Sequence, residues 1–384
     1  MKKSKVFAFA GVTLLAATFL AACSGSKDSK SASKKDTTYG YVYNDDPTTL
    51  DYTVSSKASV HDITTNGVDG LLANDKYGNL VPSIAEDWSV SKDGLTYTYK
   101  IRKGVKWYDA DGEEHGEVTA HDFVTGLKHA ADKKSETLPL VQGSVKGLKD
   151  YVDGKITDFS QVGIKAVDDY TLEYTLNQPE TFWNSKTTNG VLMPINGEFL
   201  ESKGDNFGQP GDVKSILFNG PFLLKSITSK SEITFEKNED YWDKDNVHID
   251  KIKLSYYDGS DQDSLARGFS DGSYTVARLF PASSNFASVE KKYKDNIYNT
   301  QPGAGVAVFG FNIDRQAYNH TSKTSDEQKS STKKAILNKN FRQAITFALN
   351  RENYSAQVNG KEYAKAAIRN MYTAPAFVQV NGKD

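Results

Sequence analysis

A single cysteine, Cys23, closes a leader-like segment, and its position limits how the rest of the chain can be stabilised. Three lysines within the first five residues precede the apolar stretch 6–20, and Ala21 and Ala22 lead directly into the cysteine. This order is typical of a secretory signal peptide, and the apolar stretch is short for a membrane-spanning helix. Because one cysteine allows no internal disulfide, a fold outside the cytoplasm must be held by its packed core.

The run Leu20-Ala21-Ala22-Cys23 resembles the lipobox of bacterial lipoproteins, in which the thiol is diacylated and becomes the first residue. Two acyl chains anchor a protein stably, whereas one chain gives reversible binding. The resemblance implies that 1–22 is a signal peptide and that Cys23 carries the lipid. The mature protein is then expected at the extracellular face of the cell membrane. A plain signal peptide with an incidental cysteine and a single transmembrane helix are the alternatives.

The length and charge of residues 23–384 indicate a large protein and do not suggest that it binds nucleic acid. Residues 23–384 number 362, which is enough for two or three domains. Removing the three leader lysines leaves 44 basic against 49 acidic residues, a formal charge of −5, and no basic stripe or tail occurs beyond residues 24–36. Residues 24–36 are rich in serine and lysine, so 23–36 is predicted to be the lipidated cysteine and a flexible tether. The tether lysines could also lie near anionic headgroups.

Alternating polar and apolar residues predict the strands. At 95–101 the sequence Leu-Thr-Tyr-Thr-Tyr-Lys-Ile alternates strictly, which predicts a half-buried strand. The Asp93-Gly94 turn before it predicts a hairpin with 88–90. Further strands are expected at 38–43, 171–176, 222–227, 232–237, 249–257 and 306–311. The last of these is continuously apolar, as a strand buried on both faces would be.

Helix signals are fewer but specific. Thr119 with Asp122 forms a capping-box pattern, which predicts a helix over 120–132. Apolar residues at helical spacing predict a second helix over about 339–351, and a helix-like stretch is expected before about Leu72. Residues 320–334 are polar and are expected to form a mobile surface loop. Strands and helices without regular βαβ spacing predict an α/β chain with a mixed sheet.

No group of residues in the sequence predicts catalysis. His121 and His129 are eight residues apart, about 12 Å of helical rise, which is too far to share one metal ion. The acidic cluster at 109–114 lacks the EF-hand register. No phosphate-binding loop and no G-x-S-x-G nucleophile motif is present. A binding protein without cofactor is therefore favoured over an enzyme. Some of the tyrosines at predicted strand ends are expected to line its cleft: Tyr41, Tyr43, Tyr52, Tyr256 and Tyr257.

Six colinear segments resemble a known family. They are 85–88 with 93–107, 118–124, 167–173, 219–222, 236–242 with 249–252, and 341–351. The first pair reads Ala-Glu-Asp-Trp and Asp-Gly-Leu-Thr-Tyr-Thr-Tyr-Lys-Ile-Arg-Lys-Gly-Val-Lys-Trp. It resembles the signature of the family 5 extracellular solute-binding proteins, the peptide-binding components of ABC importers. The leader and tether are similar to those of the streptococcal-type oligopeptide-binding lipoproteins.

The resemblance implies a two-lobed, class II periplasmic-binding-protein-like fold with an extra subdomain in lobe one. Lobe one is then expected at 37–75 and 186–260, the inserted subdomain at 76–185, and lobe two from 261 to 384. An interdomain crossing is expected near the polar stretch 259–263.

The resemblance also implies how the protein works. A peptide lies extended in the cleft between the lobes, its backbone pairs with strand-like segments, and hydrated pockets accept any side chain. Closure traps the peptide, and the closed protein, expected to be a monomer, docks on the ABC permease subunits. The positions that align with ligand contacts are Ser56, Lys57, Ala58, Lys230 and Tyr256. The aligned motif departs from the family where Tyr52, not proline, follows Leu50-Asp51.

The chain is shorter than the family usually is, so lobe two is expected to be incomplete. The carboxylate that pairs with the free amine of a peptide would lie in the missing region. An incomplete lobe is expected to expose apolar surface near 306–311 and to bind peptides poorly, as a fragment or the product of an interrupted gene would. The alternatives are a relative with another cargo, such as nickel, haem or sugar, and a truncated surface receptor or adhesin. An enzyme is the least favoured reading.

Overall fold

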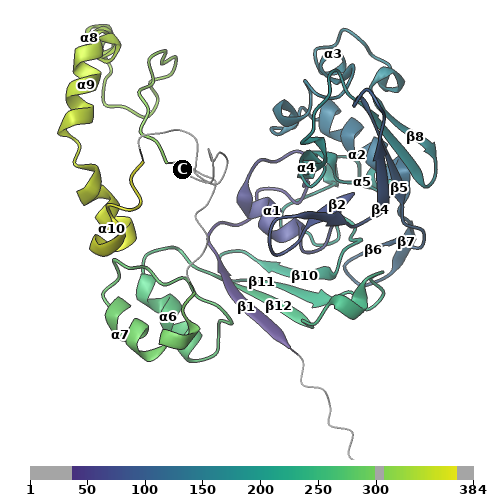
Figure 1. Cartoon of the computed structure of the whole chain (residues 1–384), viewed down its shortest axis with the longest axis horizontal. Coiled ribbons are helices and arrows are strands. Elements are labelled where there is room, and N and C mark those ends of the chain that lie inside the picture. The colour runs from purple at the N-terminus through teal and green to yellow at the C-terminus, as the bar shows by residue number, and fades with distance from the viewer. Residues whose placement is uncertain (1–36, 299–306, 370–384) are drawn as a thin grey trace, which may run out of the picture. The chain divides into compact units, whose positions relative to one another are not determined.

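The computed structural model describes residues 37–298 and 307–369 (Figure 1). Its strands are β1 Thr38–Tyr43, β2 Leu72–Asn74, β3 Leu80–Pro82, β4 Ala85–Val90, β5 Thr96–Ile101, β6 Lys106–Tyr108, β7 Glu114–Glu117, β8 Ile164–Asp168, β9 Thr171–Thr175, β10 Phe222–Thr228, β11 Glu232–Lys237 and β12 Lys251–Tyr256. Its α-helices are α1 Ala58–Thr64, α2 Ala120–Asp132, α3 Leu148–Val152, α4 Trp183–Lys186, α5 Gly197–Lys203, α6 Gln262–Ser270, α7 Phe286–Lys292, α8 Asp326–Leu337, α9 Lys339–Ala348 and α10 Arg351–Tyr363.

Two four-stranded sheets organise the chain up to residue 256. The first has the strand order β1-β12-β11-β10, with β1 and β12 parallel and the other neighbours antiparallel (Figure 1). The second has the order β4-β5-β9-β8 and is antiparallel throughout. The ladders β2-β3 and β6-β7 are two-stranded. The second sheet lies within the range expected for the inserted subdomain, whose bounds stay a prediction, as do those of both lobes and the tether.

The alternating strand at 95–101 takes the predicted form. In β5, Tyr97, Tyr99 and Ile101 are buried, while Lys100 on the other face is exposed. Tyr99 lies opposite Trp88 of β4, which confirms the predicted hairpin. Burying three large side chains from six residues contributes several kilocalories per mole to the free energy of folding, at about 1.5–3 kcal/mol for each apolar side chain.

Helix α2 covers this sheet and begins where its cap predicts. The Asp122 carboxylate accepts a hydrogen bond from the Thr119 backbone N–H at 2.9 Å and another from Trp107 Nε1 at 3.1 Å. Val118 and Phe123, which flank the cap, are fully buried. Burial raises the pKa of Asp122 to about 6, even though these donors and a contact from Gly197 lower it.

Close backbone packing joins the first sheet to the segment after α6. Thr275 N–H donates to the Gly40 carbonyl of β1 at 2.8 Å, and Gly40 N–H donates to Thr275 Oγ1 at 2.9 Å. A Cβ added at Gly40 would lie 2.4 Å from the Ser273 carbonyl oxygen. Only glycine permits this approach, so a side chain here would push the segment away from the strand.

Two of the predicted elements are wrong. Val308 and Phe309, in the run expected to be a buried strand, are 63% and 73% exposed and form no strand. A buried strand needs neighbouring strands, and those of the described residues lie between 38 and 256. The apolar exposure expected near this run is observed. Residue 306 itself lies outside the described residues.

The second wrong prediction is the surface loop at 320–334, because α8 occupies Asp326–Leu337. Ser325 Oγ accepts from the Gln328 backbone N–H at 3.2 Å, and Gln328 Oε1 accepts from the Ser325 N–H at 3.3 Å. This reciprocal cap begins the helix despite its polar composition. The predicted helix at 339–351 is confirmed as α9, which ends at Ala348. The helix expected before Leu72 is only α1, ending at Thr64.

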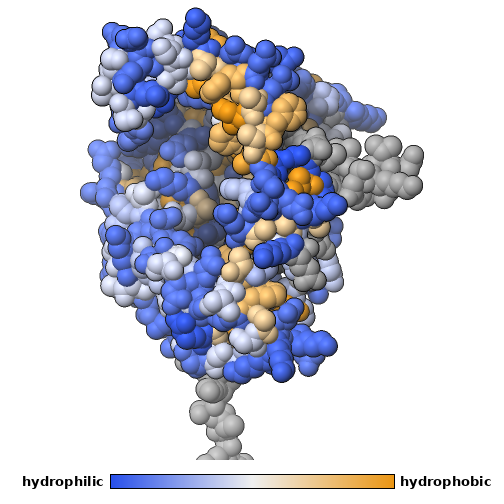
Figure 2. Space-filling model, turned by 90° about the vertical axis from the view of Figure 1, so that its left-hand side faces the viewer, coloured by the Kyte–Doolittle hydropathy of each residue, from blue (hydrophilic) through white to orange (hydrophobic). Residues whose placement is uncertain are grey.

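Exposed apolar side chains continue along α9. Phe341, Ile345 and Phe347 are 42%, 36% and 84% exposed. Figure 2 shows apolar residues, in orange, exposed on the face of the molecule that it draws. Among the described residues, no helix has the length and apolar content needed to cross a bilayer.

Candidate ligand-binding site at the end of the β1–β12 pair

The parallel strands β1 and β12 end side by side, with Tyr43 opposite Tyr256. Their rings meet edge to face at 5.5 Å between centroids. Just beyond them, Tyr257 N–H donates to the Tyr43 carbonyl at 2.8 Å, and Asn44 Nδ2 donates to the Tyr257 carbonyl at 2.8 Å. In open α/β sheets, ligands bind outside the carboxyl ends of parallel strands. This end of the sheet is therefore the natural place for a binding site.

The β10–β11 turn, residues 229–231, closes over the same end. Tyr256 N–H donates to the Ser231 carbonyl at 2.9 Å. Lys230 has a positive φ of 49°, and its side chain is exposed. The structure thus brings two of the sequence-predicted residues, Lys230 and Tyr256, to one place. Their role in ligand binding stays a prediction.

One carboxylate, Asp46, ties this turn to the end of β1. It accepts hydrogen bonds from the Tyr43 hydroxyl at 3.1 Å, the Lys230 N–H at 3.1 Å and the Ser229 hydroxyl at 2.5 Å. Burial disfavours the charged form, but the bonds from Ser229, Lys230 and Tyr43 lower the pKa of the Asp46 carboxyl overall. Burial, followed by the hydrogen bond to Asp46, raises the pKa of Tyr43 to about 12. Both groups therefore keep one ionisation state near neutral pH.

The other three predicted residues, Ser56, Lys57 and Ala58, lie in the loop that begins α1, and all three are exposed. Ser56 is fixed by Glu136, whose Oε2 accepts from the Ser56 N–H at 2.9 Å and from its hydroxyl at 2.7 Å. Lys57 is the N-terminal flanking residue of α1 and is exposed. These positions are presented on the surface by a fixed backbone.

A buried pair secures the start of the same loop. His129 Nε2 lies 2.7 Å from Asp51 Oδ2, and both side chains are 8% exposed. Asp51 Oδ1 also accepts from the Thr53 N–H and hydroxyl at 3.1 and 2.7 Å. Ser135 Oγ donates to the Thr53 carbonyl at 2.7 Å. Residues at the end of α2 and just after it therefore hold the loop 51–56 in place.

Sequence reasoning missed the residues that build these two supports. The partners of Asp46 in the β10–β11 turn are more than 180 residues away. The His129 partner Asp51 is 78 residues away. No local pattern encodes such contacts. The two histidines considered for a metal go to different carboxylates, because His121 lies 3.3 Å from Asp169. Within the described residues, no cluster of three metal-ligating side chains occurs.

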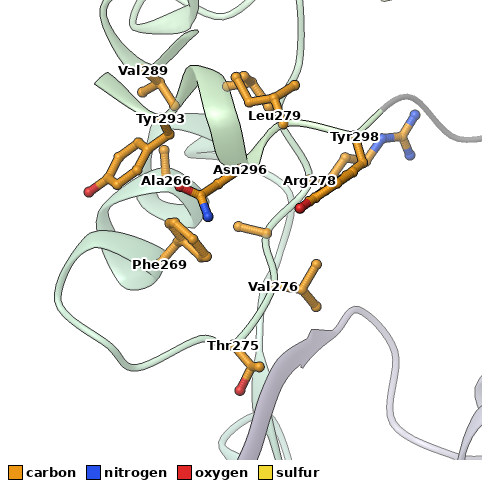
Figure 3. Close-up of a pocket in the computed structure, with 12 residues that line it drawn as sticks. Ala266, Phe269, Thr275, Val276, Arg278, Leu279, Val289, Tyr293, Asn296 and Tyr298 are labelled. Atoms are coloured by element: carbon orange, nitrogen blue, oxygen red, sulfur yellow. The ribbon is translucent and has the colours of Figure 1, made fainter. Parts of the chain in front are cut away.

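A small concavity lies in the segment that contains α6 and α7. It has a volume of about 230 Å³ and is drawn in Figure 3. Ala266 and Phe269 of α6 lie on one side, and Val289 of α7 on another. The site is smaller than the pockets that usually hold drug-sized ligands, about 300–1,000 Å³. We place the candidate site at the β1–β12 end because the ends of these parallel strands and the 229–231 turn come together there.

Comparison with known proteins gives the chain a clear set of relatives. The family model for bacterial extracellular solute-binding proteins, family 5 Middle, matches residues 79–380. Oligopeptide-binding protein AmiA of Streptococcus pneumoniae is 63% identical over 383 residues, which is 100% of this chain and 58% of AmiA. Oligopeptide-binding protein SarA of Streptococcus gordonii is 61% identical over 386 residues, with the same two coverages. The chain therefore spans 58% of the length of these relatives.

Solved structures share the fold. Listeria monocytogenes OppA bound to peptide is 30% identical, with a TM-score of 0.60 over 68% of this chain and 49% of that one. The pheromone receptor PrgZ is 24% identical, with a TM-score of 0.69 over 85% of this chain and 59% of that one, and this likeness concerns the fold alone. The expected α/β, class II binding-protein fold, present in part, is confirmed. With a family model over most of its length and relatives above 60% identity over all of it, the chain belongs to the family 5 bacterial extracellular solute-binding proteins.

Proposed function

We propose that this protein is the substrate-binding component of an ABC importer and captures extracellular oligopeptides. The observation that carries the proposal is identity of 61–63% over the whole chain with three oligopeptide-binding proteins of streptococci. An enzymatic role has no support from these relatives. The chemistry is binding and release, because no bond of the ligand needs to be made or broken.

The geometry suits recognition of a peptide backbone. An extended peptide offers the same N–H and carbonyl groups whatever its sequence, and strand-like protein segments can pair with them. The ends of β1 and β12 with the 229–231 turn, and the separate loop 56–58, are the proposed contact segments. Hydrogen bonds to Asp46 and Glu136 fix their backbones before ligand arrives. Pre-organised segments lose less conformational entropy on binding.

The proposed setting follows from the leader. Cys23, which lies outside the described residues, carries the lipid in this proposal, and the protein acts as a monomer on the outer face of the cell membrane. A tethered receptor stays close to the permease that takes up its ligand. No cofactor is required for this function.

The decisive experiment is a peptide titration of two proteins. One is residues 24–384, and the other is the same segment fused to the part of AmiA outside the matched region. We expect the fusion to bind a mixed peptide pool with micromolar affinity or better by calorimetry, and the shorter protein to bind weakly. Lys57→Ala and Tyr256→Ala should weaken binding by the fusion, while Lys92→Ala, on an exposed turn of the second sheet, should not. A folded fusion that binds no peptide would refute the function.

A further inference from the structure

A larger cavity, open to solvent, lies away from the β1–β12 end, where β5, the β8–β9 turn and the loop after β11 meet. It has a volume of about 610 Å³, within the range of small-molecule sites. Three cations line it, Lys100, Arg102 and Lys103, against one carboxylate, Glu86. The remaining lining residues are Ile101, Tyr170, Thr171 and Trp242. Among the side chains that line the cavity, positive charges therefore exceed negative ones by two.

Arg102 is held in one orientation within this cavity. Its guanidinium carbon lies 4.1 Å from the centroid of the Trp242 ring, and its Nε donates to the Ser83 carbonyl at 3.4 Å. Neither terminal nitrogen of this side chain has a hydrogen-bond partner among the described residues. A guanidinium fixed by stacking presents its two terminal NH₂ groups as a fork, the geometry that binds two oxygens of one oxyanion.

The two lysines flank that fork, and neither forms a close ion pair among the described residues. Lys103 Nζ lies 4.8 Å from the centre of the Tyr170 ring, and Lys100 Nζ donates to Thr171 Oγ1 at 3.2 Å. Within the described part of the chain, no carboxylate oxygen lies within ion-pair distance of Lys100, Arg102 or Lys103. Asp168 is near enough for the Lys100 charge to lower its pKa, though the backbone N–H of Tyr170 is the largest cause. Elsewhere on the second sheet's subdomain, lysines such as Lys106 and Lys128 do pair with carboxylates.

We propose that this cavity is a binding site for the phosphate group of a phosphate monoester, separate from the peptide site. A phosphate monoester carries about −1.5 to −2 charges at pH 7, which matches the surplus of two positive charges better than a carboxylate does. Two of its oxygens pair with the Arg102 fork, and the lysines stabilise the remaining charge. The rings of Tyr170 and Trp242 form walls against which the organic part of the ester packs.

The test is a calorimetric titration of the whole protein with four probes. These are inorganic phosphate, phenyl phosphate, benzoate, and phosphatidylcholine vesicles containing phosphatidic acid. We expect phenyl phosphate to bind at least tenfold more tightly than benzoate. Binding of phenyl phosphate identifies a soluble ester as the ligand, and binding of vesicles alone identifies a lipid headgroup. Equal affinity for benzoate, or no binding of any phosphate probe, overturns the proposal.

The variants show whether binding occurs in this cavity. Arg102→Gln with Lys103→Gln should weaken phosphate binding at least tenfold, whereas Lys92→Gln, an exposed lysine of the β4–β5 turn, should leave it unchanged. Loss of Arg102 uncovers the Trp242 ring and could disturb the fold, so a second variant is made at the exposed Lys103. Lys103→Glu should weaken phosphate binding more than Lys103→Gln does. Phosphate affinity unchanged in these folded variants would place the bound ion elsewhere and contradict the proposal. Peptide binding by the fusion protein should be unaffected, so this test is independent of the proposed function.

Discussion

Single side chains decide how firmly the loop 51–56 is held. The Asp51 carboxylate is buried, and its acceptor capacity is met by Thr53 and His129. The ring of His129 also packs edge to face on Phe207 at 5.5 Å between centroids. A buried acceptor that loses its donor retains the full cost of desolvation. Removing one partner of the Asp51–His129 pair therefore costs more stability than the intact pair contributes.

We predict that His129→Ala lowers the free energy of unfolding by about 2–4 kcal/mol, because it leaves Asp51 buried without one donor and opens a cavity beside Phe207. Urea unfolding of the variant and the parent protein measures the difference. The matched control is His121→Ala, whose partner Asp169 is exposed and whose loss should cost less than about 0.5 kcal/mol. Equal effects of the two substitutions would show that the buried pair contributes no more to the free energy of unfolding than the exposed pair does.

The buried carboxyl of Asp69 makes the stability of the protein depend on pH. Burial raises its pKa from 3.8 to about 6, although the hydrogen bond from the Tyr241 hydroxyl at 2.6 Å acts in the opposite direction. A folded-state pKa above the unfolded value means that the folded protein binds more protons between about pH 4 and 6. Its contribution to stability is therefore present at low pH and is lost as the pH rises through this interval.

We predict that Asp69→Asn removes this loss, since the amide stays neutral and keeps an oxygen for Tyr241. Between pH 4.5 and 7, the stability of the parent protein should fall relative to the variant, by at most about 3 kcal/mol at 1.36 kcal/mol per pKa unit. Urea unfolding of both proteins at the two pH values measures the change. A constant difference between them would mean that Asp69 does not change its protonation over this range.

At the scale of elements, caps and alternation predict more than composition does. The capping pattern at Thr119 predicts α2 with correct ends, and the alternation at 95–101 predicts β5 and its buried face. The same capping pattern at Ser325 and Gln328 begins α8, although the polar composition around it favours a loop. For 306–311 the apolar run was misleading, because a strand is defined by its neighbours and not by its own composition.

We predict that Ser325→Ala lowers the local stability of α8 by about 1 kcal/mol, because it removes the side-chain acceptor of the Gln328 N–H. Amide hydrogen exchange within Asp326–Leu337 should accelerate about fivefold. Thr324→Ala is the matched control, since only the backbone of Thr324 bonds to Gln328. Unchanged exchange in Ser325→Ala would assign the stability of α8 to other contacts.

The candidate site was only partly predictable from the sequence. Motif alignment indicated Lys230 and Tyr256, which the structure places together, and Ser56 to Ala58, which it places on a separate loop. The groups that fix both places, Asp46, Asp51, His129 and Glu136, are joined to their partners by contacts over 78 to 184 residues. Local sequence patterns describe faces and turns, whereas such contacts exist only once the sheet and α2 have formed.

At the scale of the whole molecule, the proposed lipid anchor at Cys23 would determine where the protein acts. We predict that Cys23→Ser moves the protein from the membrane fraction to the medium, because the serine hydroxyl is not an acceptor for the lipid and two acyl chains are needed for stable anchoring. Cell fractionation and immunoblotting measure the shift. The control is Ser24→Ala, which leaves the thiol in place. Retention of Cys23→Ser at the membrane would favour a transmembrane helix over a lipid anchor.

The parallel pairing of β1 with β12 has a consequence for when the first sheet can form during synthesis. The two strands are 213 residues apart, so β1 has no partner until residue 256 has left the ribosome. At 5–20 residues per second, this delay is roughly 10–40 s. Contacts of such long sequence separation also form slowly. If residues 1–22 act as the proposed leader, β1 still lacks its partner strand while that leader is recognised, so this sheet cannot be completed before export begins.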